Sequence, residues 1–339
     1  MTPAAVLAGL GSQLPPRLVT NDELAARLDS SDEWIRTRTG IRQRYVAPEG
    51  LLTSDLAAGA GALALKSAGL AQVDAVLVAT TTPDRPCPAT APTVAEKLGL
   101  GQVAAFDVSA VCTGFLYALA TASGLIASGT ARHVLVIGAE TFSRILDPAD
   151  RATSVIFGDG AGAVVLRAGH PEEPGALGPF ALGSDGSGQD LITVPRGVPP
   201  APAETAETAE TAETATDGYY FTMQGRTVFR LAVQRMGQSI RAALDRAGLR
   251  IDDIDRLVGH QANLRILLRL ADEIGLPRER SYSHIAEVGN TAAASLPLAL
   301  DHAHAEGALR PGDRVLLAAF GGGLTWGAVT LTWPAVDRG

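Results

Sequence analysis

The stretch Ala62–Leu70, ALALKSAGL, and the segment Asp74–Ala79, DAVLVA, predict a helix ended by glycine and then a short buried strand. The same pattern returns downstream at Ala242–Leu249, AALDRAGL, and Asp255–His260, DRLVGH. Further pairs follow in the same order in both parts of the chain: residues 133–138 resemble 314–319, and 158–166 resemble 323–331. The order of these pairs indicates that the chain contains a duplication.

We therefore expect an α/β protein built from two similar halves, 1–170 and 171–339, each with a mixed sheet and helices. A site between the halves is the natural expectation for such an arrangement. Between the halves, a proline-rich stretch precedes four copies of Ala-Glu-Thr at Ala203–Thr214. This composition offers no apolar face, so we expect a mobile, solvated loop at 199–217.

Composition limits the classes of function. The chain has 339 residues, 46% of them apolar, and a formal net charge of −8, which argues against a nucleic-acid partner. Its two cysteines, Cys87 and Cys112, form neither a disulfide framework nor a paired zinc motif. We see no signal-peptide pattern and no run of about 20 apolar residues, so we expect a cytoplasmic protein that does not enter the membrane.

Nucleotide and metal motifs are not supported by their surroundings. The glycines of Gly158–Gly162 lead into a strand-like run, whereas a dinucleotide fingerprint needs a helix there. His302 and His304 lie two residues apart in a helical pattern, where they point to different sides, so we expect exposed histidines and no metal site.

Three separate residues suggest thiol chemistry. Cys112 lies at a strand-to-helix turn, His260 follows a buried strand, and Asn290 sits in a turn before a run of small residues. Each alone is more often structural. Together they suit a nucleophile that becomes more thiolate-like at a helix N-terminus, with two hydrogen-bond donors for a developing oxyanion or enolate.

The chain resembles the β-ketoacyl-acyl carrier protein synthase III family of the thiolase superfamily. The resemblance extends from Val6 to Trp333 and rests on five stretches in order: Ser31–Ile41, Val111–Phe115, His260–Ile266, Gly289–Thr291 and Phe320–Gly323. It implies a thiolase-like αβαβα layered fold, a homodimer and no bound cofactor. It also implies that Cys112 accepts an acyl group from acyl-CoA, and that decarboxylative condensation with malonyl-acyl carrier protein follows.

The resemblance assigns the remaining site residues. His260 and Asn290 would hold the malonyl thioester oxygen, and the backbone N–H groups of Cys112 and Gly322 would form the other oxyanion hole. The CoA and pantetheine positions match these residues: Trp34, Arg38, Arg151, Phe229, Ala262 and Asn263. Ser30 and Glu33 have capping-box spacing and could start the helix that presents Trp34.

The carrier protein and the primer involve further positions. Arg230 and Arg265 match the positions that dock the acidic carrier protein. Cys87 stands where many members that use short primers have phenylalanine, so we expect branched or longer acyl-CoA primers.

Two rival functions remain open. One is a relative that transfers the acyl group to a hydroxyl or amine of a secondary metabolite without decarboxylation. The other is a non-catalytic partner subunit, although that class would be expected to lack the nucleophile. Priming of fatty-acid synthesis and priming of a polyketide pathway are not distinguished by one sequence.

Overall fold

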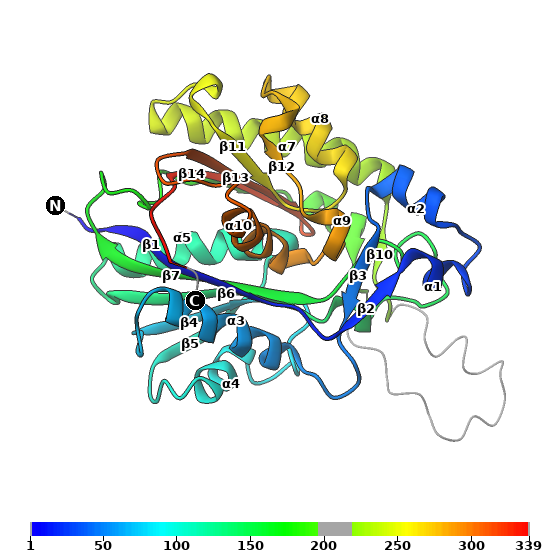
Figure 1. The fold of residues 1–339 in the computed structure, drawn as a ribbon, viewed down its shortest axis with the longest axis horizontal. Coiled ribbons are helices and arrows are strands. Elements are labelled where there is room, and N and C mark those ends of the chain that lie inside the picture. The colour runs from blue at the N-terminus through cyan, green and yellow to red at the C-terminus, as the bar shows by residue number, and fades with distance from the viewer. Residues whose placement is uncertain (1, 196–218, 338–339) are drawn as a thin grey trace.

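The computed structural model in Figure 1 describes residues 2–195 and 219–337. The predicted loop at 199–217, with its Ala-Glu-Thr repeats, lies outside the described residues. Two five-stranded sheets, with helices between them and on both outer faces, confirm the expected αβαβα fold. Among the described residues, no helix is both long and apolar enough to cross a membrane.

The first sheet has the order β1-β7-β6-β4-β5. Its central strands β6 and β4 are parallel, as are β4 and β5, whereas β7 runs antiparallel to β1 and β6. Its strands are β1 (Ala4–Gln13), β4 (Ala75–Ala79), β5 (Ala104–Val108), β6 (His133–Glu140) and β7 (Gly160–Gly169). Strand β4 is buried throughout, as expected for a parallel strand covered on both faces.

The second sheet repeats this plan in the order β12-β11-β13-β14-β8. Strand β11 is parallel to β12 and β13, and β14 runs antiparallel to β13 and β8. Its strands are β8 (Ala181–Ser184), β11 (Arg256–Gly259), β12 (Ser281–Tyr282), β13 (Arg314–Gly321) and β14 (Thr325–Thr332). Each strand pairs as its counterpart does in the first sheet, which confirms the duplication. The predicted boundary near 170 falls between β7 and β8.

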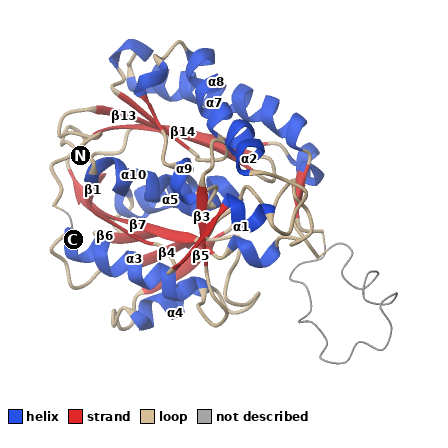
Figure 2. Cartoon of the chain, turned by 45° about the vertical axis from the view of Figure 1, so that its right-hand side comes forward, coloured by secondary structure: helices blue, strands red, loops and turns tan. Residues whose placement is uncertain are grey.

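Helices α5 (Gly114–Ala127) and α10 (Ser295–Ala305) form the central layer, as Figures 1 and 2 show. A single apolar cluster joins both helices to both sheets, including Leu119, Leu296, Leu77 and Leu317. The outer face of the first sheet is covered by α3 (Thr53–Ser67) and α4 (Thr90–Lys97). The outer face of the second is covered by α7 (Gly225–Ala247) and α8 (Leu264–Ile274).

Smaller elements surround one end of the central helices. They are β2 (Arg17–Thr20), α1 (Asn21–Ala25), α2 (Asp32–Thr39), β3 (Gln43–Val46), β9 (Ile192–Thr193), β10 (Thr222–Met223) and α9 (Ile285–Val288). Strands β2 and β3 pair with each other, and α9 packs against β3. At this end lie the residues that the sequence marks for chemistry.

Candidate active site

Cys112 lies in a short 3₁₀ turn, Val111–Thr113, between β5 and α5. Only 8% of the residue is exposed. Val111 has a φ of +48°, a left-handed conformation that is costly for a β-branched residue and occurs at functional turns. The turn holds the thiol just before the start of α5, where the helix dipole favours a negative charge.

Gly321, the last residue of β13, passes very close to the Cys112 turn. A Cβ atom at Gly321 would lie 2.9 Å from the Cys112 backbone nitrogen and 3.1 Å from that of Thr113. Only a residue without a side chain permits this approach. The next residue, Gly322, is the one predicted to complete the oxyanion hole.

His260 follows β11 and is buried, with 3% of the residue exposed. Its Nδ1 lies 2.6 Å from the Ser295 hydroxyl oxygen, and that oxygen accepts a 3.4 Å hydrogen bond from the Gln261 backbone. Burial lowers the pKa of His260 to about 3, so the imidazole is neutral. With the Ser295 proton donated to Nδ1, the His260 proton lies on Nε2, which is then the donor.

Asn290 is positioned by its backbone and by one side-chain bond. Its N–H donates to the Ile156 carbonyl at 2.9 Å, and its carbonyl accepts from Gly158 at 3.0 Å. The side-chain Oδ1 accepts from the Ala292 N–H at 2.9 Å. Because Oδ1 is engaged, the amide presents its Nδ2 donor to the site.

The segments that carry these three side chains pack together. The Cys112 turn contacts the end of β13 and the 3₁₀ turn at residues 292–294, which follows Asn290. That turn lies directly on β6, since a Cβ atom at Gly138 would be 2.3 Å from the Ala293 carbonyl oxygen. Ser295, the partner of His260, begins α10 immediately afterwards. The structure thus brings Cys112, His260 and Asn290 to the ends of α5 and α10.

Glu140, at the end of β6, is a buried acid that sequence reasoning missed. Its carboxylate accepts bonds from the Thr81 N–H at 3.0 Å, the Thr82 hydroxyl at 2.6 Å and the Ala293 N–H at 3.4 Å. Burial raises its pKa to about 7, although these hydrogen bonds oppose the shift. The sequence signal for Glu140 is an acidic residue that directly follows the apolar run 134–139.

The electrostatics differ from the sequence expectation for Cys112. Burial raises the pKa of the Cys112 thiol well above its ordinary value, and the Glu140 charge raises it further. The direction of this shift is opposite to the lowering expected at a helix N-terminus, because desolvation by burial is its largest cause.

A cavity of about 520 Å³ leads from the surface to Asn290. Arg38, Phe229, Ala262 and Asn263, all predicted to bind CoA, line it. Arg265 also lines this cavity, whereas Arg230 lies exposed on α7 and is not among the lining residues. Sequence reasoning missed Arg226, a further basic lining residue.

Trp34 lies on α2, close to two guanidinium groups. Arg38 and Arg151 lie with their guanidinium carbons 4.7 and 5.2 Å from the centre of the Trp34 ring. The predicted helix is confirmed, but its cap is not Ser30: the Ser31 hydroxyl accepts from the Trp34 N–H at 3.1 Å. Ser31 has the extended backbone that a cap requires, so the side chain one position later satisfies the free N–H.

An aromatic cluster packs beside Cys112. Phe142 and Phe157 stack at 4.3 Å, and Phe221 meets both edge-on at 5.1 and 5.0 Å.

Cys87 is exposed in the loop before α4 and is not among the residues lining the 520 Å³ cavity. Within one chain, the predicted primer-pocket residue is therefore at the surface.

The expectation of exposed histidines is wrong. His302 and His304 are both half-buried, because His302 stacks on His284 at 3.8 Å and His304 lies 3.4 Å from the Trp333 indole nitrogen.

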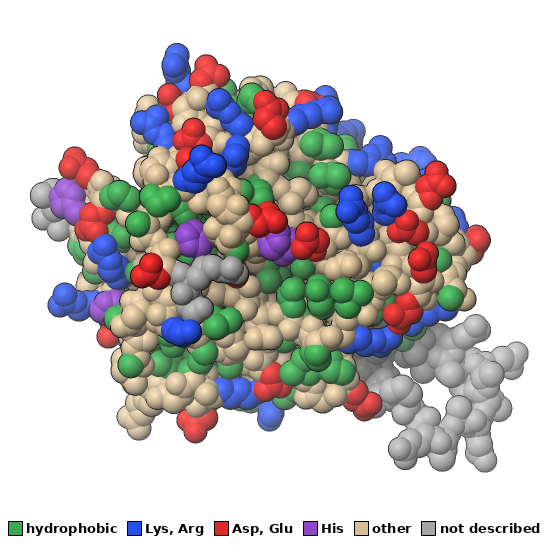
Figure 3. Space-filling view, viewed as in Figure 1, with side chains coloured by type: hydrophobic (Ala, Val, Ile, Leu, Met, Phe, Trp, Pro, Cys, Tyr) green, Lys and Arg blue, Asp and Glu red, His purple; other side chains and the backbone are tan. Residues whose placement is uncertain are grey.

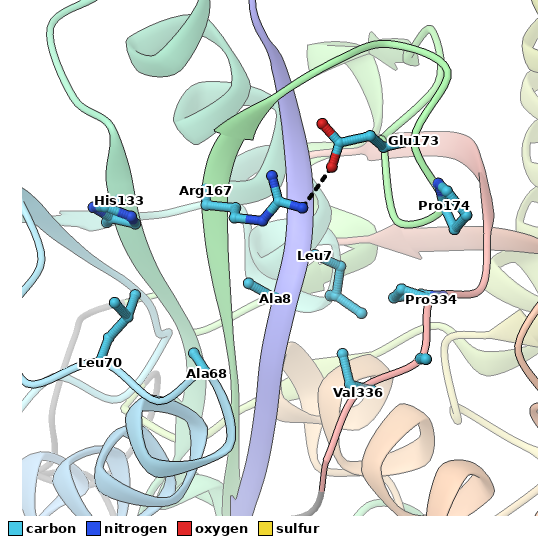
Figure 4. Close-up of a pocket in the computed structure, with 11 residues that line it drawn as sticks. Leu7, Ala8, Ala68, Leu70, His133, Arg167, Glu173, Pro174, Pro334 and Val336 are labelled. Carbon is cyan, nitrogen blue, oxygen red and sulfur yellow. Dashed lines mark hydrogen bonds and ion pairs between the residues drawn. The ribbon is translucent and has the colours of Figure 1, made fainter.

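A second cavity, of about 380 Å³, lies beside β1, β7 and the segment at 334–336 (Figure 4). Its Arg167–Glu173 ion pair spans 2.5 Å, and none of the predicted site residues lines it.

Two family models match the chain. The model described as 3-oxoacyl-[acyl-carrier-protein] synthase III matches residues 106–186, which include Cys112. The model of the C-terminal part of the same enzyme matches residues 244–333, which include His260 and Asn290.

Named relatives cover nearly the whole chain. The chain is 72% identical over 339 residues to β-ketoacyl-[acyl-carrier-protein] synthase III 3 of Streptomyces coelicolor, covering 99% of both. Among solved structures, it is similar to 3-oxoacyl-(acyl carrier protein) synthase III from Pseudomonas aeruginosa, with a TM-score of 0.91 and 52% identity. The match covers 99% of this chain and 100% of that one.

A polyketide enzyme is also similar. The priming β-ketosynthase of the R1128 polyketide pathway has a TM-score of 0.88 and 35% identity, with coverage of 98% of this chain and 96% of that one. The fold, the matched site segments and these relatives agree. The chain belongs to the β-ketoacyl-[acyl-carrier-protein] synthase III family of condensing enzymes.

Proposed function

We propose that the protein joins an acyl group from acyl-CoA to malonyl-acyl carrier protein through a thioester on Cys112. The observation that carries this proposal is the packing of the segments that carry Cys112, His260 and Asn290, of which Asn290 lines the 520 Å³ cavity. A buried thiol, two neutral hydrogen-bond donors and a basic cavity mouth suit this reaction. No metal or bound redox cofactor enters the proposal.

In the first step the Cys112 sulfur attacks the thioester carbonyl of acyl-CoA. The C–S bond to CoA breaks, the new bond to Cys112 forms, and the thiol proton leaves with the CoA sulfur. The N-terminus of α5 stabilises charge on the Cys112 sulfur as it develops. The Cys112 and Gly322 N–H groups receive the carbonyl oxygen.

In the second step malonyl-acyl carrier protein loses carbon dioxide and forms an enolate. The enolate carbon attacks the acyl-cysteine, and Cys112 leaves as a thiolate that takes up a proton. The Nε2–H of His260 and the Nδ2–H of Asn290 hold the enolate oxygen, because both are neutral donors. This assignment uses His260 as a donor and not as a general base.

Intact-protein mass spectrometry tests both steps. Wild type and Cys87→Ala should gain the acyl mass from acyl-CoA, whereas Cys112→Ala should not. Addition of malonyl-acyl carrier protein should discharge the acyl group with release of carbon dioxide and formation of a β-ketoacyl product. Discharge to a hydroxyl or amine without carbon dioxide would establish the acyltransferase alternative.

The same experiment, with a panel of acyl-CoAs, identifies the primer. We infer from the small Cys87 side chain that branched or longer primers are preferred over acetyl-CoA. Since Cys87 is exposed in a single chain, its effect requires a second subunit to place it at the pocket. Preferential acylation by acetyl-CoA would contradict this inference.

We also propose that Arg230 and Arg265 dock the acidic carrier protein. Arg265 lines the 520 Å³ cavity, so Arg265→Glu should impair the reaction with acyl-CoA as well as the reaction with carrier protein. Arg230 is not among the lining residues and gives the cleaner test. Arg230→Glu should slow the carrier-protein step and spare acylation by CoA. The control is Arg310→Glu, which makes the same change of charge at a residue before the start of β13, whereas Gly321 lies at the other end of that strand. Equal effects of the two variants on the carrier-protein step would argue against docking at Arg230.

Finally, we propose a homodimer that pairs through β5. Within residues 2–195 and 219–337, this strand is an edge strand of the first sheet, and its Phe106 is 37% exposed. An unpaired edge with an exposed aromatic side chain is a template for a second copy.

A further inference from the structure

Three potential metal ligands meet where α9 and α10 pack together, outside the site described above. His284 precedes α9, Glu287 lies on it, and His302 lies on α10. We call these residues the α9–α10 cluster. Their ligand atoms all lie within 4.8 Å of one another. Figure 3 shows histidines (purple) beside acidic side chains (red) on the face that carries these helices in Figure 1.

The donor atoms are spaced as a small cation would require. Glu287 Oε2 lies 3.6 Å from His284 Nε2 and 3.4 Å from His302 Nε2. Donors bound tetrahedrally to zinc at about 2.0–2.2 Å are roughly 3.3 Å apart. Two imidazoles and one carboxylate are a ligand set that zinc uses in proteins, with a fourth position left to water.

The hydrogen bonds of Tyr282 leave Nε2 of His302, which lies 3.4 Å from Glu287 Oε2, available to bind a cation. The Tyr282 hydroxyl donates its proton to Glu306 at 3.0 Å and lies 2.6 Å from His302 Nδ1. Its oxygen must therefore accept a proton from Nδ1, so that the Nε2 lone pair faces Glu287. A second partner that fixes the tautomer in this way is typical of metal-binding histidines.

His284 is buried yet poorly satisfied. Its side chain is 5% exposed, and neither ring nitrogen makes a hydrogen bond within residues 2–195 and 219–337. Nε2 is thus available to a cation, whereas Nδ1 still has no partner among the described residues when an ion binds Nε2.

We propose that the α9–α10 cluster binds one divalent transition-metal cation of the zinc class through His284 Nε2, Glu287 Oε2 and His302 Nε2. The two rings are now stacked at 3.8 Å and 16°, so the half-buried His302 ring must tilt when the ion enters. Glu287 is 57% exposed, which provides a route from solvent. The ion would hold α9 against α10.

The cluster is linked to the candidate active site by Gln261. The His284 N–H donates to Gln261 Oε1 at 2.8 Å, and Gln261 directly follows His260. On the other side, α9 ends two residues before Asn290. A cation at this position would therefore stabilise the segments that hold both proposed donors, without contacting the substrate.

The test is a titration of tag-free, chelator-treated full-length protein with Co²⁺ and then Zn²⁺. Wild type should bind one Co²⁺ with visible ligand-field absorption, and Zn²⁺ should displace it. Glu287→Gln and His302→Ala should each weaken binding by about tenfold or more. Zinc should also raise the melting temperature of wild type and not that of the two variants.

The matched control is His304→Ala, because His304 lies on the same helix but faces Trp333. It should bind the ion as wild type does. Absence of stoichiometric binding, or equal binding by wild type and Glu287→Gln, would overturn the proposal. Glu287→Gln changes an exposed side chain, so misfolding is not expected to obscure the result. These readouts do not involve acyl transfer, so the outcome is independent of the proposed function.

Discussion

At the scale of single residues, burial determines the chemistry of the candidate site. The same desolvation keeps Cys112 a thiol, keeps His260 neutral and raises the pKa of Glu140. These shifts disfavour a thiolate–imidazolium pair in the free protein. In the proposed reaction the thiolate forms as the acyl group leaves or arrives, when the α5 N-terminus can stabilise it.

Gly321→Ala tests the close approach of β13 to the nucleophile turn. The added Cβ would meet the Cys112 and Thr113 nitrogens at 2.9 and 3.1 Å, so the turn must move. We expect acylation of Cys112 to slow by about 100-fold, with a stability cost of about 1–3 kcal/mol. Stopped-flow acylation and chemical denaturation measure the two effects. Gly124→Ala, on α5 with open space around it, is the control and should keep normal acylation.

Glu140→Gln tests the buried carboxyl through the pH dependence of stability. Its pKa rises from 4.5 to about 7 on folding, so the folded state binds more protons than the unfolded state between these values. The contribution of Glu140 to stability is thus present below pH 4.5 and is lost as the pH rises to about 7, by up to about 3 kcal/mol.

Denaturation of wild type and Glu140→Gln at pH 5 to 8 should show this difference. The variant should lose less stability than wild type as the pH rises. Glu172→Gln, at an exposed position, should follow wild type. Parallel pH profiles for wild type and Glu140→Gln would contradict the shifted pKa.

At the scale of elements, short helices present the binding residues to the cavity. Helix α2 carries Trp34 and Arg38, and α8 begins at the cap Asn263, whose Oδ1 accepts from Arg265 at 2.9 Å. Asn263 also donates to the Arg38 carbonyl at 3.0 Å, which ties the two helices together at the cavity. Cap residues therefore position the side chains predicted to bind CoA.

Ser31→Ala should weaken substrate binding without slowing chemistry. Loss of the 3.1 Å bond to the Trp34 N–H removes about 1 kcal/mol from an eight-residue helix. We expect a several-fold higher KM for acyl-CoA and an unchanged kcat in steady-state assays. Thr20→Ala removes the same type of cap from α1, which contributes no residue to the 520 Å³ cavity, and should leave KM unchanged.

At the scale of the whole molecule, the duplication creates the site. Each half supplies one sheet and one central helix, and the ends of α5 and α10 meet between them. The first half contributes Cys112, and the second contributes His260 and Asn290. The β5 edge is the surface through which we propose that two copies pair.

Phe106→Arg tests the proposed dimer. A charged side chain on the β5 edge should prevent pairing, so sedimentation velocity should show a dimer for wild type and a monomer for the variant. Leu63→Arg is the matched control, because Leu63 is 36% exposed on α3 and Phe106 is 37% exposed. A monomeric wild type, or dimers in both variants, would contradict pairing through β5.

Much of the fold could be predicted from local patterns in the sequence. Apolar runs and terminal glycines predicted β4, β11, β6, β13, β7 and β14, and the repeated order of these elements predicted the duplication. The three chemistry-bearing residues could also be found, since each stands at the end of a strand or in a turn. Periodicity and turn preference are local properties, which is why a sequence reveals them.

The tertiary structure decided what depends on distance and burial. It brought Ser295 to His260, Glu140 to the Cys112 site, and His284 to His302, although these partners lie far apart in sequence or carry no motif. Burial in it raises the pKa of Cys112, against the expected lowering, and it replaced the expected Ser30 cap by Ser31. Desolvation and through-space contact arise only when the chain is packed, so no local pattern encodes them.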